Sequence, residues 1–412
     1  MRAPLLHVVL VLLASACALA DGTRNDDEID RWKLEPAEAI WPVRAFEDAL
    51  GGTGVILELP GHPDQYASGS VGRPGQTADA REHAALLLDR LDADAARPEA
   101  DAVAGEGFNS VVFARRGGGA PDDGSRTLLF ASLRPTEGAA LAIERTWMAL
   151  EPAHTDRIRG LAVVLPGTFG FPRELYEAWS DDLRSRGWTV LRLLSQPSRF
   201  TEYVPIDVAE GQAVAQGRRV AQIADQRAAE TAYAVQAAAR FAEGLYPELA
   251  GTPRQIVGFS GGAILLPTVV AREPERYESA VIVAGGANTA AISIDSTFVE
   301  RYIRSVDYEF LGADPAAQRA ELEEAYLRAS TLDPYHAAAA MRGTRVLIVD
   351  GTKDKAVPFR DSTLLWERLG RPDRRSYPTN HVTLFLALPE WMDEINGWLE
   401  GEPLALPNVG GP

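Results

Sequence analysis

Residues 258–262 read Gly-Phe-Ser-Gly-Gly, the only Gly-x-Ser-x-Gly in the chain. A short apolar run at 254–257 precedes this motif, and residues 263–266 follow it with helical character until Pro267. A serine at a strand-to-helix turn needs a strained backbone that pushes its hydroxyl outward, and flanking glycines remove the side chains that would clash there. The pattern therefore predicts a buried strand, a sharp turn carrying Ser260 and a helix. The alternative is a glycine-rich loop after a strand.

An aspartate and a histidine follow further along the chain. Residues 345–349 form an apolar run typical of a buried strand, and the polar turn after it contains Asp354. His381 lies in a short loop, residues 377–383, before an apolar helix. Histidine is the side chain that takes a proton from a serine hydroxyl near neutral pH, and a carboxylate on its far ring nitrogen fixes the tautomer. The order Ser, Asp, His therefore predicts nucleophilic catalysis by a serine.

With these three segments the chain resembles the α/β-hydrolase superfamily, over roughly residues 125–400. The resemblance implies an α/β fold, with a mostly parallel, twisted sheet flanked by helices. It also implies that Ser260 is the nucleophile, that His381 is the base and then the acid, and that Asp354 is the orienting carboxylate. It names a fold and a chemistry, and it does not name a substrate.

The catalytic carboxylate has a competing position four residues upstream, at Asp350. In the superfamily the acid commonly lies in the turn beyond the strand, in a pattern resembling Gly-x-x-Asp-x-x-Val-Pro. Residues 351–358 match this pattern at all four defined positions, with Asp354 in the place of the acid. Asp350 is then expected to be a strand-end residue that binds turn amides.

The histidine also has competitors, since the chain contains six. Many members of the superfamily carry glycine just before the catalytic histidine, whereas this chain has Asn380, which also accepts turn geometry. His336 follows Asp-Pro-Tyr and is expected to be a helix-start or surface residue. The others lie in the leader or precede the serine, in the wrong order for the superfamily: His7, His62, His83 and His154.

Acyl transfer also needs donors that face the developing oxyanion. One donor is expected to be the amide of Gly261, the residue after the nucleophile. The second is expected after an earlier strand, for which the apolar run at 160–165 is suited. Residues 166–170 follow as Pro-Gly-Thr-Phe-Gly, and the resemblance points to the amide of Thr168 as the donor. Members of the superfamily often have His-Gly where this chain has Pro-Gly, so an ordinary Pro-Gly turn is the alternative.

Residues 1–20 are a targeting segment and not part of the fold. Residues 5–13 are largely apolar but too short to span a bilayer as a permanent helix. Residues 13–17 resemble a bacterial lipobox, in which Cys17, the only cysteine of the chain, becomes the lipid-bearing first residue. Residues 18–20 read Ala-Leu-Ala and resemble an ordinary cleavage site. Both alternatives predict export to the bacterial periplasm, either in soluble form or as an outer-membrane-anchored lipoprotein.

The composition argues against several other functions. The formal net charge is −17, so no basic surface is expected to bind nucleic acid or anionic lipid headgroups. The sequence has no Walker A motif, no His-Glu-x-x-His and no cysteine cluster, so neither a cofactor nor a metal is indicated. The expected partner is a small-molecule acyl substrate, and membrane attachment is expected only through a lipid on Cys17.

The first quarter of the mature chain is not explained by the superfamily. Residues 21–35 are polar and acidic and are expected to be a tether. Residues 36–105 form an extension of unknown role, with a strand expected at 54–59 and a helix at 80–93. The hydrolase domain is expected at 106–400, before a tail at 401–412.

Within that domain, strands and helices are expected to alternate, as in a mostly parallel sheet with helices on both faces. Residues 111–115 and 127–133 are expected to be strands joined by glycine- and aspartate-rich turns, with a third strand at 141–148. Residues 290–340 are expected to form a helical lid or simply to pack on the core. The remaining expected segments are strands at 161–165, 188–194, 254–257, 280–284 and 345–349, and helices at 173–186, 195–243, 298–303 and 316–329.

These inferences predict an exported serine hydrolase that cleaves carboxylic esters through an acyl-enzyme intermediate. The same machinery serves amides, so a peptidase or amidase is the first alternative. A non-catalytic binding protein on a hydrolase scaffold is the second, because a fold does not determine a function.

Overall fold

The computed structural model describes residues 54–59, 66–68, 113–115, 123–135, 141–168, 173–194, 204–297 and 306–404. Several expectations lie outside these residues and stay predictions. They concern the leader with Cys17, the tether at 21–35, the helix at 80–93, the helical segment at 298–303 and most of the tail.

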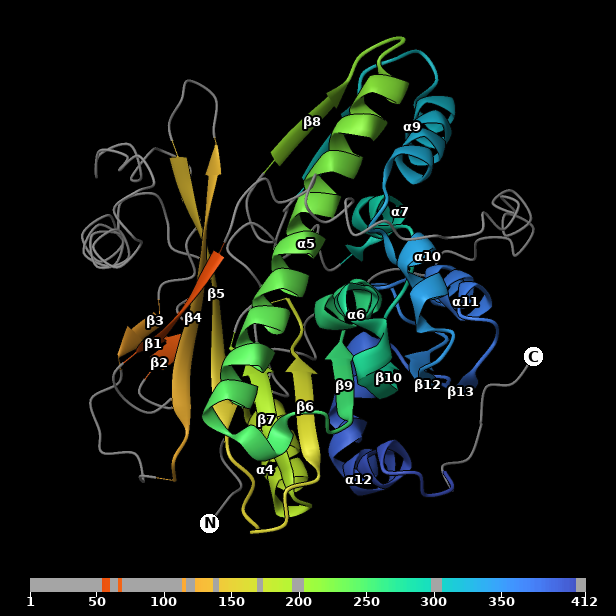
Figure 1. Cartoon of the computed structure of the whole chain (residues 1–412). Coiled ribbons are helices and arrows are strands. Elements are labelled where there is room, and N and C mark those ends of the chain that lie inside the picture. The colour runs from red at the N-terminus through yellow and green to blue at the C-terminus, as the bar shows by residue number, and fades with distance from the viewer. Residues whose placement is uncertain are drawn as a thin grey trace.

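Nine strands form one mixed sheet, in the order β1-β4-β5-β7-β6-β9-β10-β12-β13 (Figure 1). From β7 to β13 every neighbouring pair is parallel, whereas β1, β4 and β5 are joined to each other and to β7 by antiparallel pairs. Without the edge strand β1, this is the strand order of the α/β-hydrolase fold. The bounds are β1 Gly54–Leu59, β4 Arg126–Pro135, β5 Leu141–Glu151, β6 Gly160–Leu165, β7 Trp188–Leu193, β9 Arg254–Phe259, β10 Tyr277–Val283, β12 Arg345–Gly351 and β13 Asp373–Tyr377.

Helices cover both faces of the parallel part of the sheet. Along β6, Leu161, Val163 and Leu165 pack with the layer of α5, α6 and α11, while Ala162 and Val164 pack with the layer of α4 and α12. A strand buried on both sides is expected to be mostly apolar, and β6 has no polar side chain. No described helix has the length and apolarity of a membrane span. The bounds are α4 Arg173–Ser185, α5 Ala213–Leu245, α6 Gly261–Arg272, α11 Phe359–Arg368 and α12 His381–Leu399.

A further group of elements lies beyond the carboxyl ends of the parallel strands. Figure 1 shows α5 crossing the sheet face and continuing past it, with α9 alongside its upper half. A separate pair of parallel strands, β8 and β11, lies near that end of α5. The bounds are β8 Val204–Val208, α7 Thr289–Asp295, β11 Val306–Phe310, α9 Pro315–Ala329 and α10 Pro334–Ala337, with short 3-10 helices at Pro247–Leu249, Pro274–Arg276 and Ala338–Met341.

Two expectations about strands are corrected. The strands expected at 111–115 and 127–133 are not paired with each other, because β3 (Phe113–Arg115) pairs with β2 (Tyr66–Ser68) while β4 lies between β1 and β5. The sequence analysis also missed β13, whose residues read Asp-Arg-Arg-Ser-Tyr. This strand lies at the edge of the sheet, where only one neighbour is needed and polar side chains reach water.

Two expectations about helices are also corrected. The helical segment expected at 195–243 contains the strand β8, where Ile206 and Val208 are buried between exposed neighbours, and α5 begins only at Ala213. The helix after the serine does not end at Pro267 but continues to Arg272. Every residue of α6 up to Ala271 is buried, so its packing outweighs the roughly 3 kcal/mol that an internal proline costs a helix.

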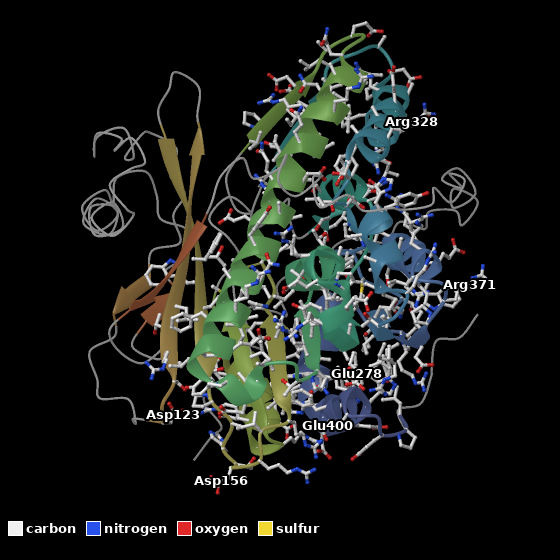
Figure 2. The ribbon with its side chains drawn as sticks, viewed as in Figure 1. Asp123, Asp156, Glu278, Arg328, Arg371 and Glu400 are labelled. Atoms are coloured by element: carbon white, nitrogen blue, oxygen red, sulfur yellow. The ribbon has the colours of Figure 1, made fainter. Side chains whose placement is uncertain are left out.

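The last residues of α12 and the residue after it bind side chains near the starts of β7, β9 and β10. Glu400, labelled at the lower end of the molecule in Figure 2, accepts a hydrogen bond from the Trp188 indole at 3.0 Å. The Leu399 carbonyl accepts from Gln255 and Ser279, each at 3.0 Å. These contacts hold the far end of the helix that begins at His381.

Close approach of α5 and α9 gives a stability prediction. A Cβ on Gly217 of α5 would lie 2.5 Å from the Leu322 carbonyl oxygen and 2.9 Å from the Ala325 Cβ, both on α9. We expect Gly217→Ala to lower the free energy of unfolding by about 1–3 kcal/mol, because the helices must move apart. Gly244→Ala is the matched control, since its Cβ would meet nothing within 4 Å and alanine is the better helix former. Urea unfolding of both variants measures this, and equal stability would contradict it.

Candidate active site

Ser260 lies at the turn between β9 and α6 in a strained backbone conformation, with φ 50° and ψ −115°. A Cβ on Gly258 would lie 2.7 Å from the Gly262 carbonyl oxygen and 2.8 Å from the Ala263 Cα. The Ser260 amide donates to the Val283 carbonyl at 2.9 Å, which ties the turn to β10. A positive φ at a serine persists only when its surroundings impose it, and here it presents the serine at the carboxyl edge of the sheet.

Asp354 and His381 are in direct contact at the same edge. The imidazole Nδ1 donates to Asp354 Oδ2 at 2.6 Å. The side chain of Asp354 is 2% exposed and that of His381 is 14% exposed. The other carboxylate oxygen of Asp354 accepts from the amides of Ala356 and Val357, at 2.8 and 3.0 Å. A carboxylate held in this way fixes the imidazole tautomer and stabilises the imidazolium form.

The chain around these two residues explains why they meet. The amides of Thr352 and Lys353 donate to the carbonyls of Tyr377 and Thr379, so the turn after β12 runs beside the loop after β13. A Cβ on Gly351 would collide with the Thr379 carbonyl oxygen, which explains the glycine of the pattern at 351–358.

Asn380, where the superfamily often has glycine, caps α12. Its side-chain oxygen accepts from the Thr383 amide at 3.0 Å. Asparagine is among the best residues for this position, because its oxygen satisfies an amide that the first turn of a helix leaves unpaired. The exchange therefore fixes the start of the helix that carries His381.

The competing residues have other contacts. Asp350 accepts from Ser362 Oγ at 2.6 Å and from Arg374 Nε at 2.9 Å, so it joins β12, α11 and β13 rather than binding turn amides. His336 is bound through Nε2 to the Leu327 carbonyl at 2.8 Å. His154 is exposed in a loop, while His7, His62 and His83 lie outside the described residues.

The loop after β6 packs directly against the start of α6. A Cβ on Gly262 would lie 2.5 Å from the Pro166 carbonyl oxygen and closer still to that of Leu165. The Gly167 amide donates to the buried Tyr176 hydroxyl at 2.9 Å. Thr168, the next residue, lines the same pocket as Ser260 and Gly261. Sequence reasoning missed Tyr176, which lies on α4 and looks like any aromatic core residue.

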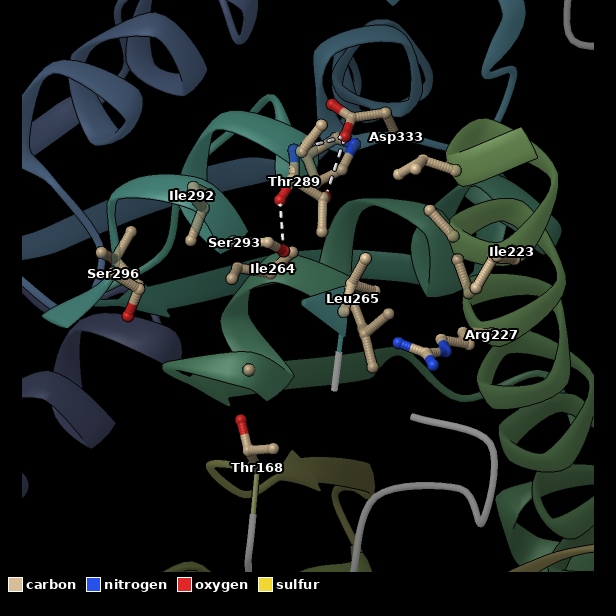
Figure 3. A pocket seen from close by; sticks show the side chains of 18 of the residues that line it. Thr168, Ile223, Arg227, Ile264, Leu265, Thr289, Ile292, Ser293, Ser296 and Asp333 are labelled. Carbon is tan, nitrogen blue, oxygen red and sulfur yellow. Dashed lines mark hydrogen bonds between the residues drawn. The ribbon is translucent and has the colours of Figure 1, made fainter. Parts of the chain in front are cut away.

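A pocket of about 110 Å³ opens beside Ser260. Figure 3 shows Thr168 below the start of α6, Ile292 and Ser296 on one side, and Ile223 and Arg227 reaching from α5 on the other. Most of the walls are apolar, so the pocket suits an uncharged hydrocarbon group next to the serine. The sequence identified none of the lining residues of α5 or β11, because an alanine-rich helix and a short strand carry no motif.

The far wall of the pocket is held by Asp333. Its carboxylate accepts from the amides of Asn288 and Tyr335 at 3.0 and 2.8 Å, from Thr289 Oγ1 at 2.8 Å and from the Tyr326 hydroxyl at 2.6 Å. A buried carboxylate with this many donors is a structural anchor between α7, α9 and α10.

A second buried carboxyl group, Asp361 in the first turn of α11, gives a pH prediction. Burial raises its pKa to about 8, aided by Asp295 and Glu323 and opposed by Arg360. The folded protein therefore keeps a proton that the unfolded chain releases near pH 4, so the free energy of unfolding falls as the pH rises from about 4 to 8. Above pH 8, Asp361→Asn should be the more stable protein by on the order of a few kcal/mol.

The measurement is thermal unfolding at pH 4, 6 and 9. Wild type and Asp361→Asn should converge at pH 4, and the exposed Asp373→Asn should follow the wild type throughout. An Asp361→Asn curve parallel to that of the wild type would rule out the raised pKa.

Comparison with known proteins supports the same class. Residues 247–381, which include Ser260, Asp354 and His381, match the model of the prolyl oligopeptidase family. Residue by residue, no curated protein matches the sequence. Together with the strand order and the serine turn, this match identifies the chain as a serine hydrolase of the α/β-hydrolase superfamily.

Several solved esterases are similar to the chain. An acetyl xylan esterase from Paenibacillus sp. R4 has 15% identity and a TM-score of 0.45, covering 88% of this chain and 100% of its own. Est1E from Butyrivibrio proteoclasticus has 14% identity and a TM-score of 0.41, covering 66% and 99%. The Pyrococcus furiosus esterase Pf2001 has 13% identity and a TM-score of 0.40, covering 66% and 91%. Identities this low carry no information about the substrate of this chain.

Proposed function

We propose that the protein hydrolyses carboxylic esters, with Ser260 as nucleophile, His381 as general base and Asp354 as the orienting carboxylate. The observation that carries the proposal is the Asp354–His381 hydrogen bond of 2.6 Å at the sheet edge where the strained Ser260 faces a pocket. His381 takes the hydroxyl proton as Ser260 attacks the acyl carbon.

The amides of Gly261 and Thr168 stabilise the oxyanion that forms during attack. Gly261 is the first residue of α6, so its amide is one that the helix itself leaves unpaired. The Gly167 amide is already committed to Tyr176, which leaves the Thr168 amide for the substrate. His381 then gives its proton to the leaving alcohol, and water removes the acyl group by the reverse sequence.

The pocket favours an ester over a peptide that is held by its free amino end. A peptidase that holds a free amino end needs a carboxylate able to accept from the ammonium group. Asp333 is the one carboxylate among the described lining residues, and its hydrogen bonds are made within the protein. An apolar acyl group needs no such partner.

A peptidase or amidase is the second candidate, and the match to the prolyl oligopeptidase family favours it. One matched pair of substrates separates the two functions. p-Nitrophenyl butyrate and butyryl p-nitroanilide share the acyl group and differ in the atom that leaves. We expect hydrolysis of the ester alone, and comparable turnover of the anilide would favour the amidase.

The experiment that tests the serine mechanism is labelling with a fluorophosphonate probe. Wild-type protein should be labelled at Ser260, and Ser260→Ala should not be. Absence of labelling in folded wild-type protein would favour a binding protein on a hydrolase scaffold.

We further propose that the chain is exported through residues 1–20, with a lipid on Cys17. This rests on the sequence alone. Mass spectrometry of the mature protein tests it, since a lipidated chain begins at a modified Cys17. A mature chain that begins at Asp21 and carries no lipid would contradict the lipoprotein proposal and favour export in soluble form.

A further inference from the structure

The pocket beside Ser260 is small enough to limit the acyl group. Its volume is about 110 Å³, and an apolar cavity of about 150 Å³ holds one benzene molecule. By that measure the pocket takes roughly four or five non-hydrogen atoms beyond the carbonyl carbon. Its aliphatic walls come from α5, α6, α7 and β11, with Ile223, Leu265, Ile292 and Val306 among them.

One polar atom in this apolar wall stands out. The Tyr308 hydroxyl, on β11, is buried and has no hydrogen-bond partner in the described part of the chain. Burial raises the pKa of the Tyr308 hydroxyl, so it keeps its proton and remains a donor. The ring is stacked on Phe310, with centroids 6.2 Å apart and planes within 7°, so the side chain is held in place.

A positive charge lies near this hydroxyl. Arg227 of α5 lines the same pocket as Tyr308, and its charge lowers the pKa of the Tyr308 hydroxyl, whereas the charge of Glu323 raises it. Figure 3 shows the guanidinium reaching inward from α5 toward Leu265. A neutral donor beside a cation is an environment that suits an oxygen acceptor.

Three other polar side chains of the pocket are engaged within the protein. Thr268 Oγ1 donates to the Leu332 carbonyl at 2.7 Å, Ser293 Oγ to the Thr289 carbonyl at 2.8 Å, and the Tyr326 hydroxyl to Asp333. Tyr308 differs from them, and buried hydroxyls without a partner are rare in native proteins. A bound ligand that supplies an acceptor would give the Tyr308 hydroxyl the partner that the described residues do not provide.

We propose that the pocket recognises short, uncharged acyl groups that carry an oxygen acceptor away from the scissile bond, such as a keto oxygen, which accepts from the Tyr308 hydroxyl in the pocket that Arg227 also lines. The expected preference in ester hydrolysis rests on the proposed esterase function. Binding of the acyl group depends only on the pocket and is testable without turnover.

The test compares acyl groups of nearly equal size. p-Nitrophenyl 4-oxopentanoate is set beside p-nitrophenyl pentanoate, so that the two acyl groups differ by a carbonyl in place of a methylene. We expect wild-type kcat/KM to favour the oxo ester about tenfold over the pentanoate, and Tyr308→Phe to bring that ratio near one.

Tyr246→Phe, outside the pocket, is the control and should keep the wild-type ratio. A wild type without preference for the oxo ester, or a preference that survives in Tyr308→Phe, would overturn the proposal. If none of the esters is cleaved, the proposed esterase function is contradicted, and the binding proposal is then tested by ligand binding alone. In that case 4-oxopentanoate should raise the thermal unfolding midpoint more than pentanoate in wild type and not in Tyr308→Phe. Equal shifts would refute the site.

Discussion

Asp354→Asn should lower kcat for ester hydrolysis by about four orders of magnitude while leaving the fold intact. The reason is the hydrogen bond from His381 Nδ1 to Asp354 Oδ2, which at 2.6 Å fixes the imidazole with Nε2 available for a proton. An asparagine amide in the same place donates instead of accepting, so the ring adopts the wrong tautomer. Steady-state kinetics on p-nitrophenyl butyrate measures the effect, with circular dichroism as the check on folding.

Asp350→Asn is the matched control, because it makes the same chemical change four residues away. Asp350 pairs with Arg374 and Ser362. Its replacement should reduce stability by about 3–5 kcal/mol, since it leaves a largely buried guanidinium without its counter-charge. The folded fraction should keep kcat within a few-fold of wild type. Loss of activity in Asp350→Asn alone would assign the catalytic acid to the strand end.

Gly262→Ala should reduce kcat by about two to three orders of magnitude. The added Cβ meets the carbonyl oxygens of Leu165 and Pro166, which are backbone atoms and unable to rotate away. The loop carrying Thr168 must therefore move, and a displaced oxyanion donor costs most of its contribution to the transition state. A loss of about 1–3 kcal/mol in stability should accompany the change.

The kinetic signature distinguishes this effect from general damage. KM should change little while kcat falls, because the donor acts mainly in the transition state. Gly343→Ala, where a Cβ meets nothing within 4 Å, should match the wild type in both quantities. Wild-type kcat in Gly262→Ala would show that the loop after β6 takes no part in catalysis.

Local sequence signals predicted the central part of the fold well. The strands at 160–165, 254–259 and 345–351 each contain a run of apolar residues, as is typical of buried parallel strands, and glycines mark the sharp turn at Ser260. The errors have physical causes. Tertiary packing carried α6 through Pro267, and the polar edge strand β13 showed no apolar run.

The residues of the candidate site likewise fall into those that a sequence pattern predicted and those that it did not. The turn pattern at 351–358 predicted Asp354 rather than Asp350 as the catalytic acid. Its glycine, Gly351, is required because the Thr379 carbonyl oxygen approaches closely. No pattern indicated Tyr176, Arg227 or Tyr308, because their roles depend on elements distant in sequence that come together only in the fold. The leader, Cys17 and the extension before residue 54 stay predictions.

The 33-residue helix α5 lines the pocket and is separate in sequence from the proposed catalytic residues. Its first half contributes Val220, Ile223 and Arg227 to the pocket, whereas Ser260, Asp354 and His381 come from turns and a helix start at the sheet edge. Substitutions on that half of α5 are therefore a route by which evolution or engineering alters substrate range while leaving the bond-breaking apparatus untouched. Libraries directed at this helix should yield new preferences more often than libraries directed at the sheet.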